Sequence, residues 1–240
     1  MCSIRDEVHI TKGNCIMTDT IINVSSLSFG YAGSDVLVLE DITFDIKKGE
    51  AALIIGASGS GKTTLLKMLD KSMMPEGRLS GKAEYYGRQI SSLSQAEAAV
   101  KIGYVGQNPD NQIVTDKVWH ELAFGLENLR MPYEQMKRTV AEIVNYFDLQ
   151  KIYHEDTDKL SGGQKQLVNL AAVMAMHPKV LILDEPTAQL DPAARKDFLV
   201  MLQKIHKEFG LTIILTSHNL EDVMEMSDEC AVSYTHLRAH

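Results

Sequence analysis

One glycine-rich stretch constrains the fold of this chain more than any other segment. An apolar, strand-like run at 51–55 comes first, a helical pattern begins at 65, and between them lie Gly56, Ala57, Ser58, Gly59, Ser60, Gly61, Lys62, Thr63 and Thr64. Glycines let a backbone curl with its N–H groups pointing inward, and the start of a helix adds partial positive charge. Strand, glycine-rich turn and helix in this order predict a loop that binds the phosphates of a nucleoside triphosphate.

Two side chains of this loop have expected roles in binding. Lys62 would reach the β- and γ-phosphates, and the Thr63 hydroxyl would ligate Mg²⁺. Upstream, residues 21–29 and 36–46 are rich in β-formers and predict a small antiparallel sheet, with Tyr31 on the turn between them. The Tyr31 ring could stack on a purine, although on this segment alone an aromatic half-buried at a hairpin is equally consistent.

Two carboxylates follow a second apolar run. Residues 180–183 are all aliphatic, which is typical of a strand inside a parallel sheet. Asp184 and Glu185 come at its carboxyl end, where parallel sheets place their ligand crevice. We therefore expect Asp184 to hold Mg²⁺ through water and Glu185 to orient or deprotonate an attacking water.

Two further polar residues stand just past predicted strands. Gln107 follows the strand expected at 102–105, and His218 follows the one expected at 211–216. His218 is a candidate contact to the γ-phosphate. Gln107 either points into the nucleotide site or is simply solvated.

A second glycine-rich helix start lies later in the chain. Ser161 is a good N-cap for a helix expected over 165–176, and Gly162 and Gly163 leave backbone N–H groups uncovered. An ordinary capped helix would not need two consecutive glycines, so a second anion-binding helix start is predicted here.

The region between the two glycine-rich segments changes character at residue 111. Residues 75–81 are expected to form a loop, 82–86 a strand and 94–100 a short helix. From 111 to 156 the pattern is helical, with helices expected at 118–129 and 133–147.

Composition limits the classes of protein that remain. The chain has 240 residues, 45% of them hydrophobic, and a net charge of −8, which argues weakly against nucleic acid as the main partner. Cys2, Cys15 and Cys230 show no metal-ligand spacing and predict no disulfide framework. No apolar run approaches the roughly 20 residues of a membrane span, and no secretory signal is evident, so a soluble cytosolic chain is expected.

In this order, the motifs resemble those of the ATPase subunit of ABC transporters over about residues 20–232. The matching pieces are the phosphate loop (Walker A), Gln107 (the Q-loop), 160–164 (the LSGGQ segment), 180–185 (Walker B), Asp191 (the D-loop) and His218 (the switch histidine). The resemblance implies an α/β fold: a P-loop NTPase (RecA-like) core with an antiparallel β-subdomain and an inserted α-helical subdomain at about 111–165. A single ABC ATPase domain at 21–232 is therefore expected.

The resemblance also implies the cofactors and the composite site. ATP and Mg²⁺ are expected, with two ATP molecules held between two ATPase units arranged head to tail. Lys62, Gln107, Glu185 and His218 would serve catalysis, and Thr63, Gln107 and Asp184 would serve the metal. The nucleotide-binding residues would be the phosphate loop from Gly56 to Thr64, Tyr31, Gln107, Asp191 and, from the other unit, Ser161, Gly162, Gly163 and Gln164.

Within this family, the segment from Gln107 to Gln112 and the run at 118–129 resemble the ATPases of energy-coupling factor transporters, which import vitamins or transition-metal ions. The expected partners are a second ATPase unit and a transmembrane component, at the cytoplasmic face of the cell membrane, with no nucleic acid. Three alternatives stay open: a conventional ABC transporter ATPase, a soluble ABC ATPase acting on nucleic acid or the ribosome, and a regulatory half that hydrolyses ATP poorly. No heptads run through 65–159 and no basic linker is evident, which disfavours the nucleic-acid types.

Some residues depart from the family pattern. Leu167 stands where arginine is usual, and Gln189 where a small residue is commoner. Both resemble the N-terminal half of fused tandem ATPases, so the native polypeptide could continue into a second unit. Residues 1–20 are expected to be an unstructured tail, with Met17 a possible true start. Residues 233–240 resemble translated sequencing adapter and are expected to be non-native.

Overall fold

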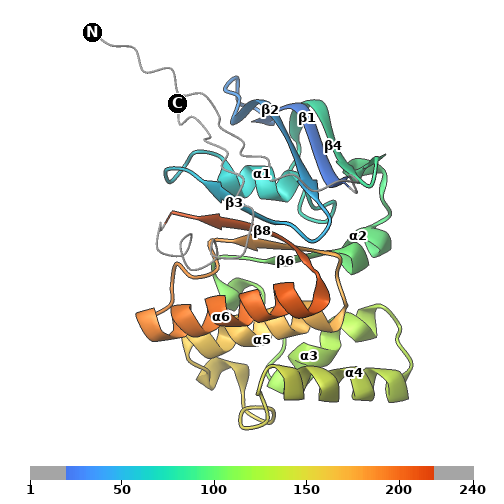
Figure 1. The fold of residues 1–240 in the computed structure, drawn as a ribbon, viewed down its shortest axis with the longest axis vertical. Helices are drawn as coiled ribbons and strands as arrows, with labels where there is room; N and C mark the ends of the chain where they lie inside the picture. Colours follow the sequence, from blue (N-terminus) through green and yellow to red (C-terminus); the bar gives the residue numbers. More distant parts are fainter. Residues whose placement is uncertain (1–19, 219–240) are drawn as a thin grey trace.

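The computed structural model describes residues 20–218, which form two sheets with helices between and beneath them (Figure 1). The first sheet is antiparallel, and its strand order is β2-β1-β4-β5. Its strands are β1 (Thr20–Tyr31), β2 (Leu39–Lys47), β4 (Gly77–Tyr85) and β5 (Arg88–Gln89). This is the antiparallel sheet that the β-forming segments before the phosphate loop predict.

The second sheet is parallel and has the order β3-β8-β7-β6. Its strands are β3 (Ala51–Ile55), β6 (Ile102–Val105), β7 (Val180–Asp184) and β8 (Thr212–Ser217). Parallel strands expose their carboxyl ends along one edge of a sheet. The phosphate loop after β3 therefore lies on the same edge as the residues that follow β6, β7 and β8.

Six helices and three short 3₁₀ turns complete the described part of the chain. The helices are α1 (Lys62–Met68), α2 (Gln95–Lys101), α3 (Val118–Asn128), α4 (Tyr133–Tyr146), α5 (Gly162–Ala175) and α6 (Pro192–Phe209). The turns are η1 (Ile90–Ser92), η2 (Pro109–Asn111) and η3 (Thr157–Lys159). None of the helices within 20–218 is long and apolar enough to cross a membrane.

The layers follow from the two-residue period of the parallel strands. On β7, Ile182 packs toward α1 and the antiparallel sheet, whereas its neighbours Leu181 and Leu183 pack toward α5 and α6. Figure 1 shows the result: α1 lies between the two sheets, and α5 and α6 cover the opposite face of the parallel sheet. Helices α3 and α4 lie beyond α5, at the far end of the molecule from the antiparallel sheet.

The structure corrects three expected boundaries. Residues 75–81 are not all loop, because β4 begins at Gly77 and pairs with the end of β1. A Cβ at Gly77 would lie 2.3 Å from the carbonyl oxygen of Gly30, so glycine here permits a close approach of two strands. The strand expected from residue 36 begins only at Leu39, and the helix expected from residue 165 begins at Gly162.

Other expected elements agree with the structure. The helices expected at 118–129 and 133–147 are α3 and α4, and the short helix expected at 94–100 is α2, capped by Ser94. The apolar runs expected to be buried strands are β3, β6, β7 and β8, and all four lie in the parallel sheet. Expectations for residues 1–19 and 219–240, including the tails and the last helix and strand, lie outside the described residues.

Candidate functional site

The phosphate loop closes around the ammonium group of Lys62. Positive φ angles at Gly59 (80°) and Gly61 (91°) bend the loop into the start of α1, in a backbone region that favours glycine. Lys62 is only 4% exposed, and its Nζ donates to the carbonyl oxygens of Gly56 at 2.8 Å and Ala57 at 3.0 Å. Its charge is thus held inside the loop.

The same ammonium group meets the carboxylate that follows β7. Lys62 Nζ lies 3.1 Å from Glu185 Oε1, and His218 Nδ1 lies 3.3 Å from Glu185 Oε2. Glu185 is 18% exposed at its side chain, so the pair with Lys62 is largely shielded from water. Three residues that the sequence places far apart are therefore in direct contact at the carboxyl edge of the parallel sheet.

The backbone of Glu185 is in an unusual conformation. Its φ angle is +46°, in the left-handed region that costs a non-glycine residue roughly 1–3 kcal/mol. The Thr216 hydroxyl, on the neighbouring strand β8, accepts a hydrogen bond from the Glu185 N–H at 2.9 Å. This contact holds the turn that aims the carboxylate at Lys62.

Asp184 is held by two hydroxyl groups from the strands on either side. Tyr104 on β6 donates to Asp184 Oδ2 at 3.1 Å, and Thr216 on β8 donates to Oδ1 at 2.9 Å. Burial, and then the negative charge of Asp184, raise the pKa of the Tyr104 hydroxyl, which therefore stays a donor. Sequence reasoning missed both hydroxyls. The signal in the sequence was Thr216, a polar residue in a largely apolar run, which could have indicated a buried hydrogen bond.

The donor set fits a magnesium ion. Asp184 is buried and its carboxylate orientation is fixed, while the Thr63 side chain is exposed at the start of α1. Both supply hard oxygen atoms, which Mg²⁺ prefers, and a fixed carboxylate suits an ion that keeps several waters. Three or more clustered His, Cys, Asp or Glu side chains, as a fully protein-ligated metal would need, do not occur within 20–218.

Tyr31 lies beside the phosphate loop. It is the last residue of β1 and is 39% exposed. Its hydroxyl is 2.9 Å from the Thr64 hydroxyl on α1, and its ring meets Phe29 edge to face at 5.1 Å. The phenol is therefore anchored while the ring keeps an exposed face.

The second glycine-rich helix start, at α5, is capped by its own side chains. Ser161 Oγ accepts from the Gln164 N–H at 3.3 Å, and Gln164 Oε1 accepts from the Ser161 N–H at 2.9 Å, which is a capping box. A Cβ at Gly163 would lie 2.8 Å from the Cβ of Ala194 on α6, whereas one at Gly162 would meet nothing within 4 Å. The close approach of α6 thus requires a glycine at position 163, whereas no neighbour within 4 Å requires one at position 162.

Asp191 caps the next helix. Its carboxylate accepts from the N–H groups of Ala193 and Ala194 at the start of α6. Among the described residues, no hydrogen bond or ion pair joins Asp191 or the 161–164 segment to the phosphate loop. These two predicted pieces of the site are not brought to the Lys62–Glu185 pair within this chain.

The Gln107 loop, residues 106–112, directly follows β6. Gln107 itself is exposed, one residue after Gly106. The second glutamine, Gln112, instead turns back into the loop and accepts from the Asn169 side chain on α5 at 2.8 Å.

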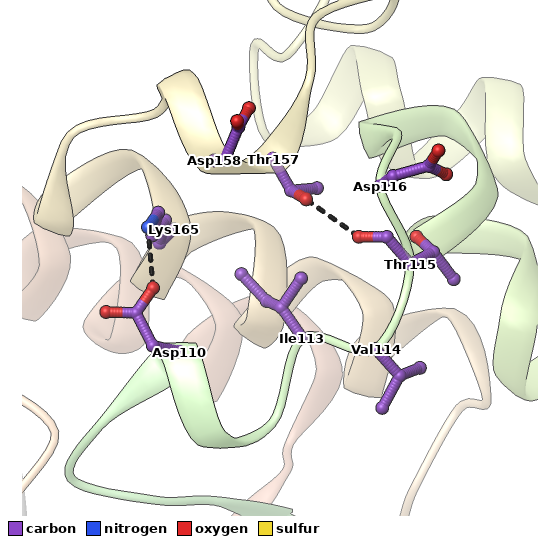
Figure 2. Close-up of a pocket in the computed structure, with 8 residues that line it drawn as sticks. All are labelled: Asp110, Ile113, Val114, Thr115, Asp116, Thr157, Asp158 and Lys165. Carbon is purple, nitrogen blue, oxygen red and sulfur yellow. Dashed lines mark hydrogen bonds and ion pairs between the residues drawn. The ribbon is translucent and has the colours of Figure 1, made fainter.

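A cavity of about 340 Å³ opens beside this loop (Figure 2). Thr157 Oγ1 donates to the carbonyl of Thr115 at 2.7 Å across one wall, and Lys165 pairs with Asp110 across another. The lining carries three carboxylates against one ammonium group, and it comprises Asp110, Ile113, Val114, Thr115, Asp116, Thr157, Asp158 and Lys165.

Comparisons with known proteins agree with this geometry. A family model described as ABC transporter matches residues 39–188. A protein of Bacillus cereus, named as an ABC transporter ATP-binding protein, is 46% identical over 204 residues. That match covers 85% of this chain but 37% of the relative, so the chain spans little more than a third of that protein's length.

Other relatives are closer to this chain in length. The energy-coupling factor transporter ATP-binding protein EcfA1 of Ligilactobacillus salivarius is 37% identical over 213 residues, covering 89% of this chain and 72% of that protein. EcfA1 of Staphylococcus aureus is 39% identical over 207 residues, with 86% and 76% covered. The structure of cbiO1 from Clostridium perfringens, described as part of the ABC transporter complex cbiONQ, matches with a TM-score of 0.77 and 33% identity, covering 85% of this chain and 81% of that one.

Proposed function

The chain belongs to the ABC transporter family as an ATPase domain, and we propose that it drives an importer of the energy-coupling factor type. The observation that carries the proposal is the buried Lys62, held between the carbonyls of a phosphate loop and the carboxylate of Glu185. Relatives named as energy-coupling factor ATPases support the subtype. The proposed cargo class is a vitamin or a transition-metal ion.

Binding of ATP would begin by redirecting Lys62. A triphosphate carries more negative charge than a carboxylate and meets the uncapped N–H groups at the start of α1. It would therefore draw the Lys62 ammonium from Glu185, 3.1 Å away, toward the β- and γ-phosphates. Glu185, still next to His218, would then be free to bind water.

Hydrolysis would proceed by in-line attack of that water on the γ-phosphate. The water oxygen forms the new bond to phosphorus as the bond to the β-phosphate oxygen breaks, and the water proton passes to Glu185. Lys62 and His218 would neutralise charge on the transferred group. When bound, Mg²⁺ would add charge neutralisation, held by Thr63, Gln107 and, through water, Asp184.

The remaining proposed residues complete the nucleotide pocket. Tyr31 would stack on the base. The segment of Ser161, Gly162, Gly163 and Gln164, with Asp191, would act on the nucleotide of a second ATPase unit in a head-to-tail pair. Among the described residues, no hydrogen bond or ion pair joins these residues to the phosphate loop, which supports a role in trans. ATP would favour the closed pair, and hydrolysis would release it.

The acidic cavity is our proposed contact for a transmembrane partner. Cytoplasmic loops of membrane proteins carry an excess of lysine and arginine. A cavity with three carboxylates against one ammonium group is complementary to such a loop, and it lies between the Gln107 loop and the start of α5. The proposed location is therefore the cytoplasmic face of a membrane, where the partner would read the state of the nucleotide site.

Replacing Glu185 with glutamine tests the proposed mechanism. We expect Glu185→Gln to bind ATP within about twofold of the native protein while phosphate release falls by roughly 10²–10⁴, the range for loss of a general base. Glu142→Gln on the exposed face of α4 is the matched control and should retain full turnover. Turnover of Glu185→Gln that equals the control would reject Glu185 as the base.

A further inference from the structure

The start of the Gln107 loop is held by a side chain from its own far end. Gln112 Oε1 accepts a short hydrogen bond from the Gly106 N–H, and Gln112 Nε2 donates to the carbonyl of Tyr104 at 3.3 Å. A Cβ at Gly106 would lie 3.1 Å from Gln112 Oε1, so the glutamine packs directly on this backbone. The loop is thus closed on itself immediately before Gln107.

Helix α5 holds the same point from the other side. Gln166 is fully buried and its Nε2 donates to the carbonyl oxygen of Gly106 at 3.1 Å. Asn169 is 4% exposed, and its Nδ2 donates to Gln112 Oε1 at 2.8 Å. The Gly106 carbonyl is therefore bound by Gln166 of α5. The Gly106 N–H is bound by Gln112, which itself accepts a hydrogen bond from Asn169 of α5.

A charged contact adds a third tie between loop and helix. Lys165 Nζ pairs with Asp110 Oδ1 at 2.5 Å, and the Lys165 side chain is only 17% exposed. Residues 165, 166 and 169 have the spacing that places side chains on one side of a helix. One face of α5 thus contacts the Gln107 loop at three successive places, close behind the helix start at Ser161.

We propose that Gln112 is a positioning residue: its amide, held by Asn169, fastens the Gln107 loop to helix α5. This inference rests on the proposed function for the roles of Gln107 and Ser161. A displacement of Gln107 at the nucleotide then moves α5 with it, and the Ser161 end of that helix moves as part of the same body. Residues 106–112 and α5 form one unit rather than a loop beside a helix.

The first experiment measures the fastening without any nucleotide. Hydrogen–deuterium exchange of the full-length protein is followed at the peptide containing the Gly106 amide, in the native protein and in three variants. Gln112→Met keeps the length of the side chain but removes its acceptor. Gln112→Glu keeps an acceptor for both Gly106 and Asn169 but loses the donor to the Tyr104 carbonyl. Gln150→Met is the matched control, since Gln150 is exposed and, within residues 20–218, donates to the nearby Asn145.

We expect Gln112→Met to speed exchange at Gly106 roughly tenfold, the factor that corresponds to loss of one hydrogen bond. Gln150→Met should exchange at the native rate within about twofold, and Gln112→Glu, which loses only the donor to Tyr104, should exchange more slowly than Gln112→Met. Unchanged exchange at Gly106 in Gln112→Met would overturn the proposal. This result does not depend on ATP hydrolysis, so it stands apart from the proposed function.

The second experiment separates positioning from folding. With Mg²⁺-ATP and its partner unit, Gln112→Met should lose about tenfold in kcat with a smaller change in KM for ATP, because the phosphate loop still binds ATP while the γ-phosphate step needs Gln107 in place. Gln112→Glu should recover part of the lost kcat, because it keeps the acceptor for Gly106 and Asn169. Turnover of Gln112→Met equal to that of Gln150→Met would overturn the positioning role, while hydrolysis by both would leave the proposed function intact.

A variant at Asn169 keeps the proposal testable if the Gln112 variant has a folding defect. If Gln112→Met does not fold, Asn169→Leu removes the α5 side of the link and leaves Gln112 on Gly106. It should lower kcat about threefold while the melting temperature stays near that of Gln150→Met. An Asn169→Leu protein with native kcat would overturn the tie to α5.

Discussion

The chain has two glycine-rich helix starts that resemble each other in sequence and differ in structure. At α1 the N-cap is Gly61, no side chain caps the helix, and the loop is arranged around the buried ammonium of Lys62. At α5 the N-cap is Ser161, whose capping box with Gln164 satisfies the N–H groups of Ser161 and Gln164. The first start is the one that we propose to bind the phosphates of ATP within its own chain. The second is a helix end capped by its own side chains, which we propose to act on the nucleotide of a second unit.

Removing Lys62 should have the largest effect, because it breaks the feature that makes the first start distinctive. In Lys62→Ala, hydrolysis should fall about 10³-fold, since a buried positive charge that would stabilise the transferring phosphate is lost. ATP affinity should fall as well. Lys67→Ala, one turn later on the same helix, is the control. Phosphate release and nucleotide titration measure the two effects, and equal losses in both variants would contradict the assignment.

Changing Ser161 sharpens the contrast between capping and binding. Ser161→Asp keeps a good N-cap but places a negative charge where the γ-phosphate of a second unit would lie. We expect a native melting temperature with hydrolysis lowered about 10²-fold in the assembled pair. ATP binding by the diluted chain should be unchanged. A variant that loses ATP binding when diluted would show that Ser161 acts within its own chain.

The two glycines of the second start should respond differently to alanine. Gly163→Ala places a methyl group 2.8 Å from Ala194 Cβ, and overpacking of this kind costs roughly 1–3 kcal/mol of unfolding free energy. Gly162→Ala meets nothing within 4 Å and should be neutral or slightly stabilising. Denaturant unfolding of the two variants measures the difference. Equal stabilities would mean that α6 does not restrict this helix start.

The smallest expected effect concerns the loop that leads into the second start. Hydrogen bonds from Lys117 and Lys159 lower the pKa of Asp156 to about 2 from its ordinary 3.8. A carboxyl whose folded pKa is depressed contributes stability above its unfolded pKa, and that contribution disappears as pH falls through the folded pKa. Asp156→Asn should therefore be less stable than the native protein near neutrality. The two unfolding midpoints should converge between about pH 4 and pH 2. A constant difference across this window would show that the ion pairs do not stabilise the fold.

Much of this protein follows from sequence alone. The order of motifs placed it in the ABC transporter family with an α/β P-loop core, and the family model and relatives confirm both. Local pattern was sufficient because apolar alternation and runs determine the strands, while glycine and N-cap residues mark helix starts. The parallel strands β7 and β8, the helical pair α3 and α4, and the Ser161 cap were all expected and are all present. The domain boundaries and site roles remain predictions.

Other features were decided only by tertiary structure, since they depend on contacts between segments far apart in the chain. The hold of Tyr104 and Thr216 on Asp184 requires three strands side by side in the order β8-β7-β6. The grip of α5 on Gly106 joins residues about 60 positions apart, and no spacing rule in the sequence reports it. The sequence predicted a loop at Gly77, because a glycine gives the same local signal for a turn and for a close approach of two strands. Local propensity determines elements, whereas the partner of a polar side chain is set by packing.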